Sequence, residues 1–139
     1  YSYQEISNLL NKKSGMLGLT GFSDMREIQK GHIDGDPDCT LALEMNAYRI
    51  KKYIGAYAAA MNGLDALVFT AGIGENSSIL REMVCSEMDF LGIELNPEKN
   101  NSKDKGIREI QSDHSRAKVL IVPTNEELEI AKQSFVLIN

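Results

Sequence analysis

Cysteine is scarce in this chain of 139 residues, and long apolar runs are absent from it. The two cysteines, Cys39 and Cys85, are far apart and form no C-x-x-C pair, so the sequence indicates neither a zinc site nor a disulfide framework. Two free thiols in a reducing cytoplasm are the simpler interpretation. No apolar stretch reaches the ~18–20 residues that a membrane-spanning helix requires, so we expect no membrane segment.

Positive charge is also in deficit, with 15 basic against 20 acidic side chains and a formal charge of −5. This balance argues against a nucleic acid or an anionic membrane as a partner. The hydrophobic share of 42% and the length fit one globular domain, taken as residues 1–139. The sequence starts at Tyr1 without an initiator methionine or a signal peptide, so a piece of a longer protein is one interpretation.

Helix caps organise the first part of the chain. Ser2 and Glu5 have the spacing of a capping box, and Gly15 is expected to end the helix that they begin. Residues 18–21 are expected to form a glycine-rich turn.

A second short helix is expected after that turn, capped by Ser23 or Asp24 and stopped by Gly31. Asp36, followed by a proline, then marks the start of a long helix that should run to about Met61. Its apolar stripe, predicted to be core, comprises Leu43, Ala47, Ile50, Ile54, Tyr57 and Met61. Alanines beside the late part of this stripe indicate a second burial surface, such as a subunit interface.

The second half of the chain predicts an α/β pattern. Residues 64–70 are almost all apolar and predict a buried strand of a parallel sheet. Residues 71–76 are expected to turn sharply into a helix capped by Ser77 or Ser78. A polar loop is expected at residues 96–104.

Two further strands are predicted at residues 107–110 and 118–122, joined as a hairpin. The last helix should begin after Pro123, with Thr124 and Glu127 as its capping box.

The most informative local feature is the segment Gly72-Ile73-Gly74-Glu75-Asn76 between a strand and a helix. Glycines at the carboxyl end of a strand let a ligand approach the backbone, and ligands bind at this edge of open α/β sheets. The alternative is an ordinary tight turn that uses two glycines. The segment lacks the third glycine of a dinucleotide fingerprint and the Gly-Lys-Ser/Thr of a P-loop.

Three charged residues have a structural and a functional interpretation. Asp24 is either a helix cap or an acceptor for ribose hydroxyls. Arg26 is either a solvated charge or a planar guanidinium stacked on a base. Glu126 either complements the dipole of the last helix or points at a metal or ligand, whereas its neighbour Glu127 is explained by the capping box.

Other polar residues favour structural roles. Asp34, Asp36 and Asp38 alternate like metal ligands, but the rest of a calcium loop is missing, and a turn and a cap explain them. His32 and His114 are isolated in loops, so no catalytic triad can be assembled from them.

Several segments together carry a family resemblance. In chain order they are LNKKSG (residues 10–15), GLTG with DMR (18–21 and 24–26), GD (35–36), FTAGIGEN (69–76) and PTNEEL (123–128). Each motif alone is modest, but in this order they resemble the acetate kinase family, specifically its C-terminal third. The resemblance covers nearly the whole chain.

This resemblance implies an α/β fold, namely the helix-rich C-terminal part of a ribonuclease-H-like lobe of the kind found in sugar kinases, Hsp70 and actin. The first strands of that lobe would precede Tyr1. It also implies transfer of the γ-phosphoryl of ATP to acetate, giving acetyl phosphate and ADP, in a reversible reaction in the cytoplasm. The family's lobe dimerises, so a homodimer through the long helix around residues 50–61 is expected.

Site residues follow from the resemblance by position. Asp24, Met25 and Arg26 would line the adenosine pocket, and Gly72, Ile73, Gly74, Glu75 and Asn76 would form its opposite wall. Glu126 would match the carboxylate associated with Mg²⁺, or Mn²⁺ in its place. A magnesium ion typically takes one or two protein carboxylates and leaves its other positions to phosphate and water.

The family's substrate arginine, catalytic Asp and His, second arginine and phosphate loop have no matching motif in this sequence. Acetate or acetyl phosphate would therefore bind through the missing part, and the chain alone is not expected to be active. Two alternatives stay open: a propionate or butyrate kinase, and a non-catalytic module for nucleotide binding or dimerisation.

Overall fold

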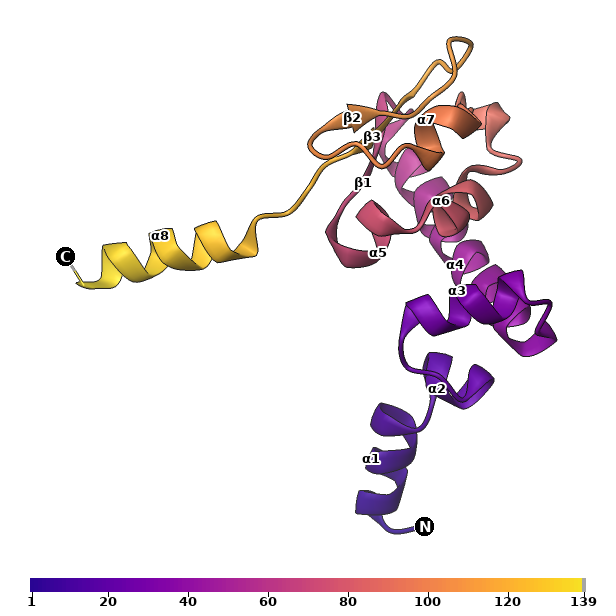
Figure 1. Cartoon of the computed structure of the whole chain (residues 1–139), viewed down its shortest axis with the longest axis vertical. Helices are drawn as coiled ribbons and strands as arrows, with labels where there is room; N and C mark the ends of the chain where they lie inside the picture. Colours follow the sequence, from indigo (N-terminus) through magenta and orange to yellow (C-terminus); the bar gives the residue numbers. More distant parts are fainter. Residues whose placement is uncertain (139) are drawn as a thin grey trace. The chain divides into compact units, whose positions relative to one another are not determined.

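The computed structural model describes residues 1–138, which form two compact units with a boundary between Asn62 and Gly63. The first unit is helical, and the second contains a small sheet with helices around it (Figure 1). Together they give a helix-rich α/β chain, as the sequence predicts.

The first unit begins with helices α1 (Tyr3–Lys12) and α2 (Gly15–Thr20). The predicted capping box is confirmed, because the Ser2 amide donates to Glu5 Oε2 at 2.6 Å and the Glu5 amide donates to Ser2 Oγ at 3.3 Å. The expected end at Gly15 and the glycine-rich turn over residues 18–21 are wrong. Helix α1 already ends at Lys12, and Gly15 opens α2, which stays helical as far as Thr20 because Met16, Leu17 and Leu19 favour a helix despite Gly18. Gly21, with φ +78°, takes the left-handed conformation and ends α2.

Helices α3 (Met25–Ile33) and α4 (Pro37–Met61) follow. Asp24 caps α3 and Asp36 caps α4, each by accepting backbone N–H groups, and Asn62 ends α4 with φ +59°. The predicted span of the long helix is confirmed.

Gly31 does not stop α3, contrary to the sequence-based expectation; the helix continues past it to Ile33. A methyl group at Gly31 would lie 2.5 Å from Cys39 Sγ and 3.1 Å from Cys39 Cβ. The glycine therefore permits the close approach of α3 and α4, which is a tertiary constraint rather than a local one.

The core of the first unit is smaller than the predicted stripe. Its buried apolar side chains are Ile28, Cys39, Ala42, Leu43, Ala47 and Ala58. Ile50 and Ile54 are only half-buried, and Tyr57 and Met61 are 63% and 62% exposed. The prediction that the whole stripe is core is thus wrong beyond Ala47, and the late part of α4 offers an apolar and aromatic surface instead.

The second unit has a three-stranded mixed sheet of β1 (Ala66–Phe69), β2 (Arg108–Glu109) and β3 (Lys118–Ile121) in the order β1-β3-β2. Strands β1 and β3 are parallel, with Ala66 opposite Lys118, and β2 runs antiparallel to β3. Both pairings agree with the predictions. The expected burial of β1 is wrong, because it is an edge strand and leaves Val68 49% exposed.

The helices of this unit are α5 (Ala71–Asn76), α6 (Ser78–Cys85), α7 (Pro97–Asn101) and α8 (Glu126–Ile138), with a 3₁₀ turn η1 (Asp89–Leu91) between α6 and α7. The cap by Ser77 is confirmed, since its hydroxyl accepts the Leu80 amide at 3.1 Å. The expected polar loop at residues 96–104 contains α7, because Asn96 caps a helix with proline at its first position.

The core of the second unit surrounds β3. Val119 and Ile121 of that strand are fully buried, as are Val84 of α6 and the flanking Ile93 and Ile110. Helix α8, by contrast, has no buried residue. Across residues 1–138, no helix combines the length and the apolar character that a membrane span requires.

The contact at Gly31 generates a stability prediction. Gly31→Ala should lower the free energy of unfolding by about 1–3 kcal/mol, because the new methyl group would overlap Cys39 Sγ and force α3 away from α4. Gly55→Ala is the matched control: it is also a glycine inside a helix, and its added methyl group would meet nothing within 4 Å. The control should be neutral or stabilise by up to ~1 kcal/mol in chemical denaturation, and equal effects of the two changes would contradict the packing argument.

Candidate functional site

The glycine segment lies directly after β1, at the carboxyl edge of the sheet. It is not the expected sharp turn: residues 71–76 form the short helix α5, entered through Ala71 with φ +60°. A side chain on Gly74 would lie 3.3 Å from the Phe69 carbonyl carbon, so Gly74 is a packing glycine. One on Gly72 would meet nothing within 4 Å, so the backbone there is open to approach.

The carboxyl ends of β1 and β3 are joined by side chains. Glu75 Oε1 accepts the Thr124 amide at 2.8 Å and the Thr124 hydroxyl at 3.1 Å. The Thr70 hydroxyl donates to the Val122 carbonyl at 2.7 Å. The glycine segment and the segment before α8, far apart in sequence, are thereby brought together.

The predicted capping box of the last helix is wrong. Thr124 is engaged by Glu75, and the cap is Asn125, whose Oδ1 accepts the Leu128 amide at 3.0 Å. Helix α8 accordingly begins at Glu126, and no hydrogen bond to Glu127 is needed for its start.

Arg81, on α6, is a residue that the sequence reasoning missed. It is only 2% exposed, and its guanidinium binds the backbone of α5. Nη1 donates to the carbonyls of Gly74 at 2.9 Å and Glu75 at 3.0 Å. Nε and Nη2 donate to Oδ1 and the carbonyl of Asn100, each at 2.8 Å. Burial, and secondly the charge of Arg108, lower the pKa of Arg81 to about 10.

Asn100 completes this clamp. It is 1% exposed, and its side-chain Nδ2 donates to the Ser78 carbonyl at 3.0 Å. This hydrogen bond ties α7 to the start of α6. The only signal in the sequence was an arginine on the apolar face of a helix. That signal does not show that Arg81 is buried, because its hydrogen-bond partners become known only from the structure.

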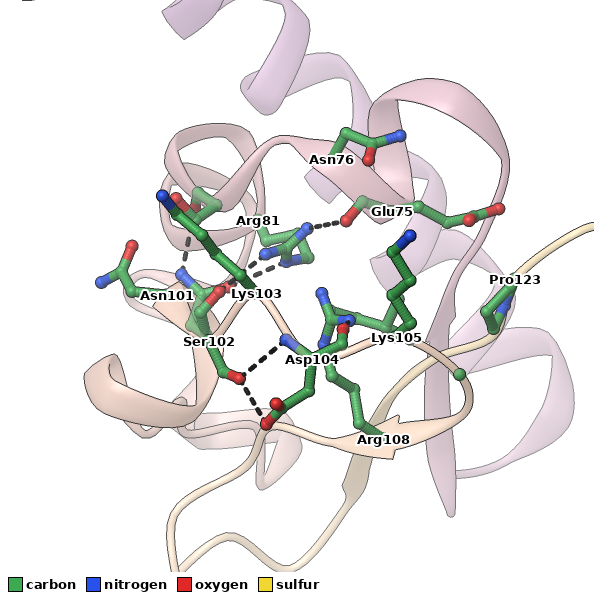
Figure 2. A pocket seen from close by; sticks show the side chains of 14 residues that line it. Glu75, Asn76, Arg81, Asn101, Ser102, Lys103, Asp104, Lys105, Arg108 and Pro123 are labelled. Carbon is green, nitrogen blue, oxygen red and sulfur yellow. Dashed lines mark hydrogen bonds between the residues drawn. The ribbon is translucent and has the colours of Figure 1, made fainter.

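A cavity of about 500 Å³ adjoins the clamp (Figure 2). It is bounded by α5 and α6 on one side and by the loop from Asn101 to Arg108 on the other. Its charged lining residues are Glu75, Arg81, Lys103, Asp104, Lys105 and Arg108.

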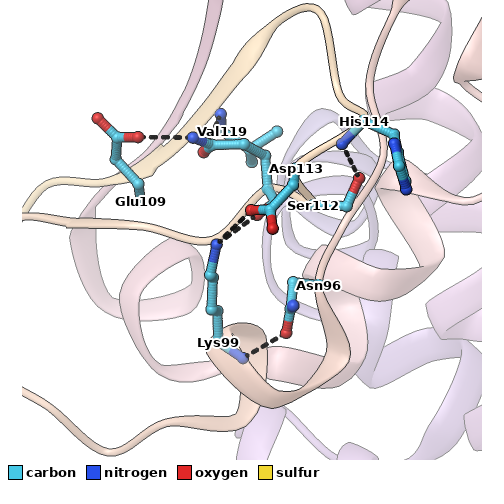
Figure 3. A network of polar contacts seen from close by, with 8 residues as sticks. Asn96, Lys99, Glu109, Ser112, Asp113, His114 and Val119 are labelled. Atoms are coloured by element: carbon cyan, nitrogen blue, oxygen red, sulfur yellow. Dashed lines mark hydrogen bonds and ion pairs between the residues drawn. The ribbon is translucent and has the colours of Figure 1, made fainter.

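A second polar network joins α7 to the segment between β2 and β3 (Figure 3). Lys99 Nζ lies 3.4 Å from Asp113 Oδ1 and 3.2 Å from the Gln111 carbonyl, while the Lys99 amide donates to Asn96 Oδ1 at 3.0 Å. These contacts anchor α7 to the segment before β3. The His114 backbone amide donates to Ser112 Oγ at 3.2 Å, and this residue lies in a loop as expected. The loop expected at His32 is wrong, because His32 lies in α3 and its Nδ1 is 2.9 Å from the Thr40 hydroxyl.

Asp24 and Arg26 belong to the first unit and form an ion pair. Asp24 Oδ1 accepts the Arg26 amide at 2.8 Å, and Nε of Arg26 lies 3.0 Å from both oxygens of Asp24. These hydrogen bonds lower the pKa of Asp24 to about 2. The cap is confirmed, while the side chain of Arg26 is 89% exposed and its guanidinium face is accessible for stacking.

Glu126 lies in the first turn of α8 and is exposed. In the part of the chain that the structure describes, no three His, Cys, Asp or Glu side chains gather as a metal site, at Asp34, Asp36 and Asp38 or elsewhere. A lone exposed carboxylate fits a magnesium ion whose other ligands are phosphate oxygens and water, and does not fit a metal held by protein alone.

Comparisons with known proteins give a consistent result. The Acetokinase family profile matches residues 1–132. The chain is 56% identical over 138 residues to the acetate kinase of Flavobacterium johnsoniae, covering 99% of this chain and 35% of that protein. It is 58% identical over 136 residues to the acetate kinase of Thermotoga maritima, covering 96% of this chain and 34% of that protein.

Solved structures agree. The crystal structure of Porphyromonas gingivalis acetate kinase matches all of this chain and 35% of its own, with a TM-score of 0.87 and 45% identity. A propionate kinase from Francisella tularensis matches 94% of this chain and 33% of its own, with a TM-score of 0.84 and 40% identity. The chain therefore spans about a third of the length of the relatives it matches.

The ion pair of Asp24 generates a prediction about acid titration. Arg26→Gln should raise the pKa of Asp24 from about 2 toward its ordinary value near ~4, because the side-chain hydrogen bonds from the guanidinium are the largest cause of the shift. Carboxyl titration by NMR measures this change directly. Lys30→Gln removes the same charge from α3 without touching Asp24 and should leave its pKa unaltered.

The sign for stability follows from the same shift. The pKa of Asp24 is lower in the folded chain than in the unfolded chain, so the ion pair stabilises the fold above about pH 4, and this contribution is lost as the pH falls toward 2. A pKa of Asp24 that stays near 2 in Arg26→Gln would show that the cap alone sets it.

Proposed function

Because the chain belongs to the acetokinase family, we propose that it forms the nucleotide-binding, C-terminal part of an acetate kinase. The complete enzyme would transfer the γ-phosphoryl of ATP to acetate, giving acetyl phosphate and ADP, and would run in either direction. The observation that carries the proposal is the match over residues 1–132, together with an open glycine segment at the carboxyl edge of a parallel strand pair. The reaction would take place in the cytoplasm.

The chain would form a single, partial lobe over residues 1–139, of the ribonuclease-H-like type found in actin-like ATPases. The parallel pair β1–β3 with an unpaired edge on β1 supports this proposal, since earlier strands of such a lobe would continue the sheet there. The Asp24–Arg26 pair and residues 72–76 would supply the two walls of the adenosine pocket.

Each wall has groups suited to a nucleoside. The exposed guanidinium of Arg26 is planar and can stack on a base, and Met25 beside it is half-buried and apolar. On the other wall the backbone at Gly72 is open, and Ile73 is exposed to make apolar contact. Arg81 fixes the carbonyls of Gly74 and Glu75, so this wall is rigid before the ligand arrives.

Glu126 would hold Mg²⁺, or Mn²⁺, together with the nucleotide's phosphates. The metal would supply charge neutralisation on the transferred phosphoryl group. The chain's own contribution is positional. Glu75 holds Thr124 and Asn125 caps α8, so the backbone just before Glu126 is fixed to the proposed nucleotide wall, from which its carboxylate would reach the metal.

A propionate kinase is the second candidate, because the Francisella tularensis propionate kinase matches this chain nearly as well as the acetate kinase structures do. Selection between acyl chains would occur in the part that carries the carboxylate-binding residues. A butyrate kinase and a non-catalytic nucleotide-binding module are further alternatives. Measured turnover of the complete polypeptide would exclude the non-catalytic module.

The role of Glu126 gives the sharpest test of the proposal. In the complete polypeptide, Glu126→Ala should lower kcat by roughly 10²-fold or more and raise the magnesium concentration needed for half-maximal rate, since metal-bound charge stabilisation is worth several kcal/mol. The melting temperature should barely change, because a carboxylate at an exposed helix start contributes only ~0.3–1 kcal/mol.

Glu127→Ala is the control, since it removes the same charge from the same turn of α8. It is not the cap, so both its turnover and its thermal stability should stay close to those of the unaltered protein. Near-normal magnesium dependence in Glu126→Ala would leave Glu126 with the helix-dipole role alone. Measuring the rate over a range of magnesium concentrations, together with thermal melts, distinguishes a metal-binding role of Glu126 from a helix-dipole role.

The exposed surface of α4 supports a homodimer. Tyr48, Tyr53, Tyr57 and Met61 are all more than half exposed along one helix, an unusual apolar surface for a helix of a monomer. The chain should therefore self-associate, and light scattering at high micromolar concentration should give twice the monomer mass. Tyr53→Glu and Tyr57→Glu together should restore the monomer mass, whereas a monomer before substitution would rule out this interface.

A further inference from the structure

The cavity beside α5 holds positive charge that the described residues do not neutralise. Four cationic side chains line it, from Arg81, Lys103, Lys105 and Arg108, against two acidic ones, from Glu75 and Asp104 (Figure 2). Within residues 1–138, neither arginine and neither lysine of this set has a carboxylate oxygen within 4.0 Å. For Arg81, which is only 2% exposed, the lack of a carboxylate partner is unusual, because charged groups taken out of water are normally paired.

Arg81 is the most deeply buried of the four. Its four hydrogen bonds all go to neutral oxygens, three of them backbone carbonyls and one the side-chain amide of Asn100. Such oxygens orient a guanidinium but leave its net charge in place. The lowered pKa of Arg81 agrees with a cation that is desolvated and faces a second cation, Arg108.

Arg108 has an unused donor. Its Nη1 donates to the Asp104 carbonyl, while its Nε is buried and has no hydrogen-bond partner. Buried donors without partners are rare in native proteins, and each requires an explanation. An anion that enters the cavity from solution would supply both a hydrogen-bond acceptor for Arg108 and the missing negative charge.

The two acidic side chains of the lining are occupied elsewhere. Glu75 Oε1 accepts two hydrogen bonds from Thr124, and Asp104 Oδ2 accepts the Ser102 hydroxyl at 2.6 Å. Neither carboxylate forms an ion pair with Arg81 or Arg108, and four cations against two carboxylates leave the lining with an excess of positive charge. The loop that carries Lys103, Lys105 and Gly106 leaves the two ammonium groups exposed at the mouth of the cavity.

We infer that this cavity binds a small dianionic phosphate group, held by Arg108 and Arg81 inside and by Lys103 and Lys105 at the mouth. Guanidinium groups match the oxygen spacing of phosphate and form charge-assisted hydrogen bonds with it. The cavity, at about 500 Å³, has room for the anion with bridging water. The cavity shares Glu75 and Asn76 with the proposed adenosine wall, but the four cations that would hold the anion lie outside residues 24–26 and 72–76, so the inference goes beyond the function proposed above.

Binding there has a structural consequence. Arg81 carries the anion on one side and the carbonyls of Gly74 and Glu75 on the other. Neutralising the repulsion between the two arginines would stabilise the clamp on α5. Amide hydrogen exchange at residues 74–77 should accordingly slow when phosphate is bound.

The experiment is calorimetric titration of the 139-residue chain with inorganic phosphate at constant ionic strength set by chloride. We expect saturable binding of one phosphate per chain with a Kd of ~1 mM or tighter. Arg108→Gln should weaken it at least ~10-fold, and Lys105→Gln by a smaller factor. Lys132→Gln, on the exposed face of α8, removes the same charge outside the cavity and should leave the Kd unchanged.

Three outcomes would overturn the inference. The first is the absence of saturation up to ~20 mM phosphate, and the second is an equal loss of affinity in Lys132→Gln and Arg108→Gln, which would indicate a non-specific charge effect. The third is competitive displacement of phosphate by adenosine alone, which would make the cavity part of the nucleoside site. Circular dichroism and thermal melts establish that each variant is folded, and the Lys105→Gln titration stands by itself if Arg108→Gln is not.

Discussion

The organisation of the second unit depends on how the carboxyl ends of two parallel strands are fastened together. The backbone ladder continues as far as Val122, whose amide donates to the Phe69 carbonyl at 2.9 Å, and beyond that point side chains hold together the segments that leave the strands. Here Glu75 accepts two hydrogen bonds from Thr124, and Arg81 fixes the carbonyls behind α5. The position of residues 72–76 and the direction in which the chain enters α8 both follow from these few contacts, so a functional edge is built without a long ordered loop.

Sequence reasoning succeeded where the determinants are local. Asp36 and Asn62 bound a helix of 25 residues as predicted, because an N-cap and a left-handed C-cap are properties of a few neighbouring residues. It failed where the role of a residue depends on a partner that is distant in the sequence. Gly31 looked like a helix terminator but is a contact point for Cys39, and Thr124 looked like a cap but is the partner of Glu75, 49 residues earlier. The burial of β1 was overestimated because apolar composition cannot distinguish a central strand from an edge strand.

The candidate site divides in the same way. The glycine segment was found from its place between a strand and a helix, while the roles of Asp24, Met25, Arg26 and Glu126 came from family resemblance and stay predictions. Arg81 was missed, because nothing in its sequence neighbourhood of Leu80 and Glu82 shows that it is buried; its importance is visible only from its four hydrogen-bond acceptors. The sequence likewise assigned no role to Lys103, Lys105 and Arg108, which the fold brings around one cavity with Arg81.

Strand β1 has a consequence for handling the chain. It pairs with β3 on one side only, and its other side presents backbone donors and acceptors next to the exposed Val68. No proline lies within Ala66–Phe69 and no charged residue does either, so the usual devices that block strand addition are missing from this edge. An edge of this kind recruits further strands, whether from its own polypeptide or from other molecules, and its exposure favours aggregation during expression and concentration.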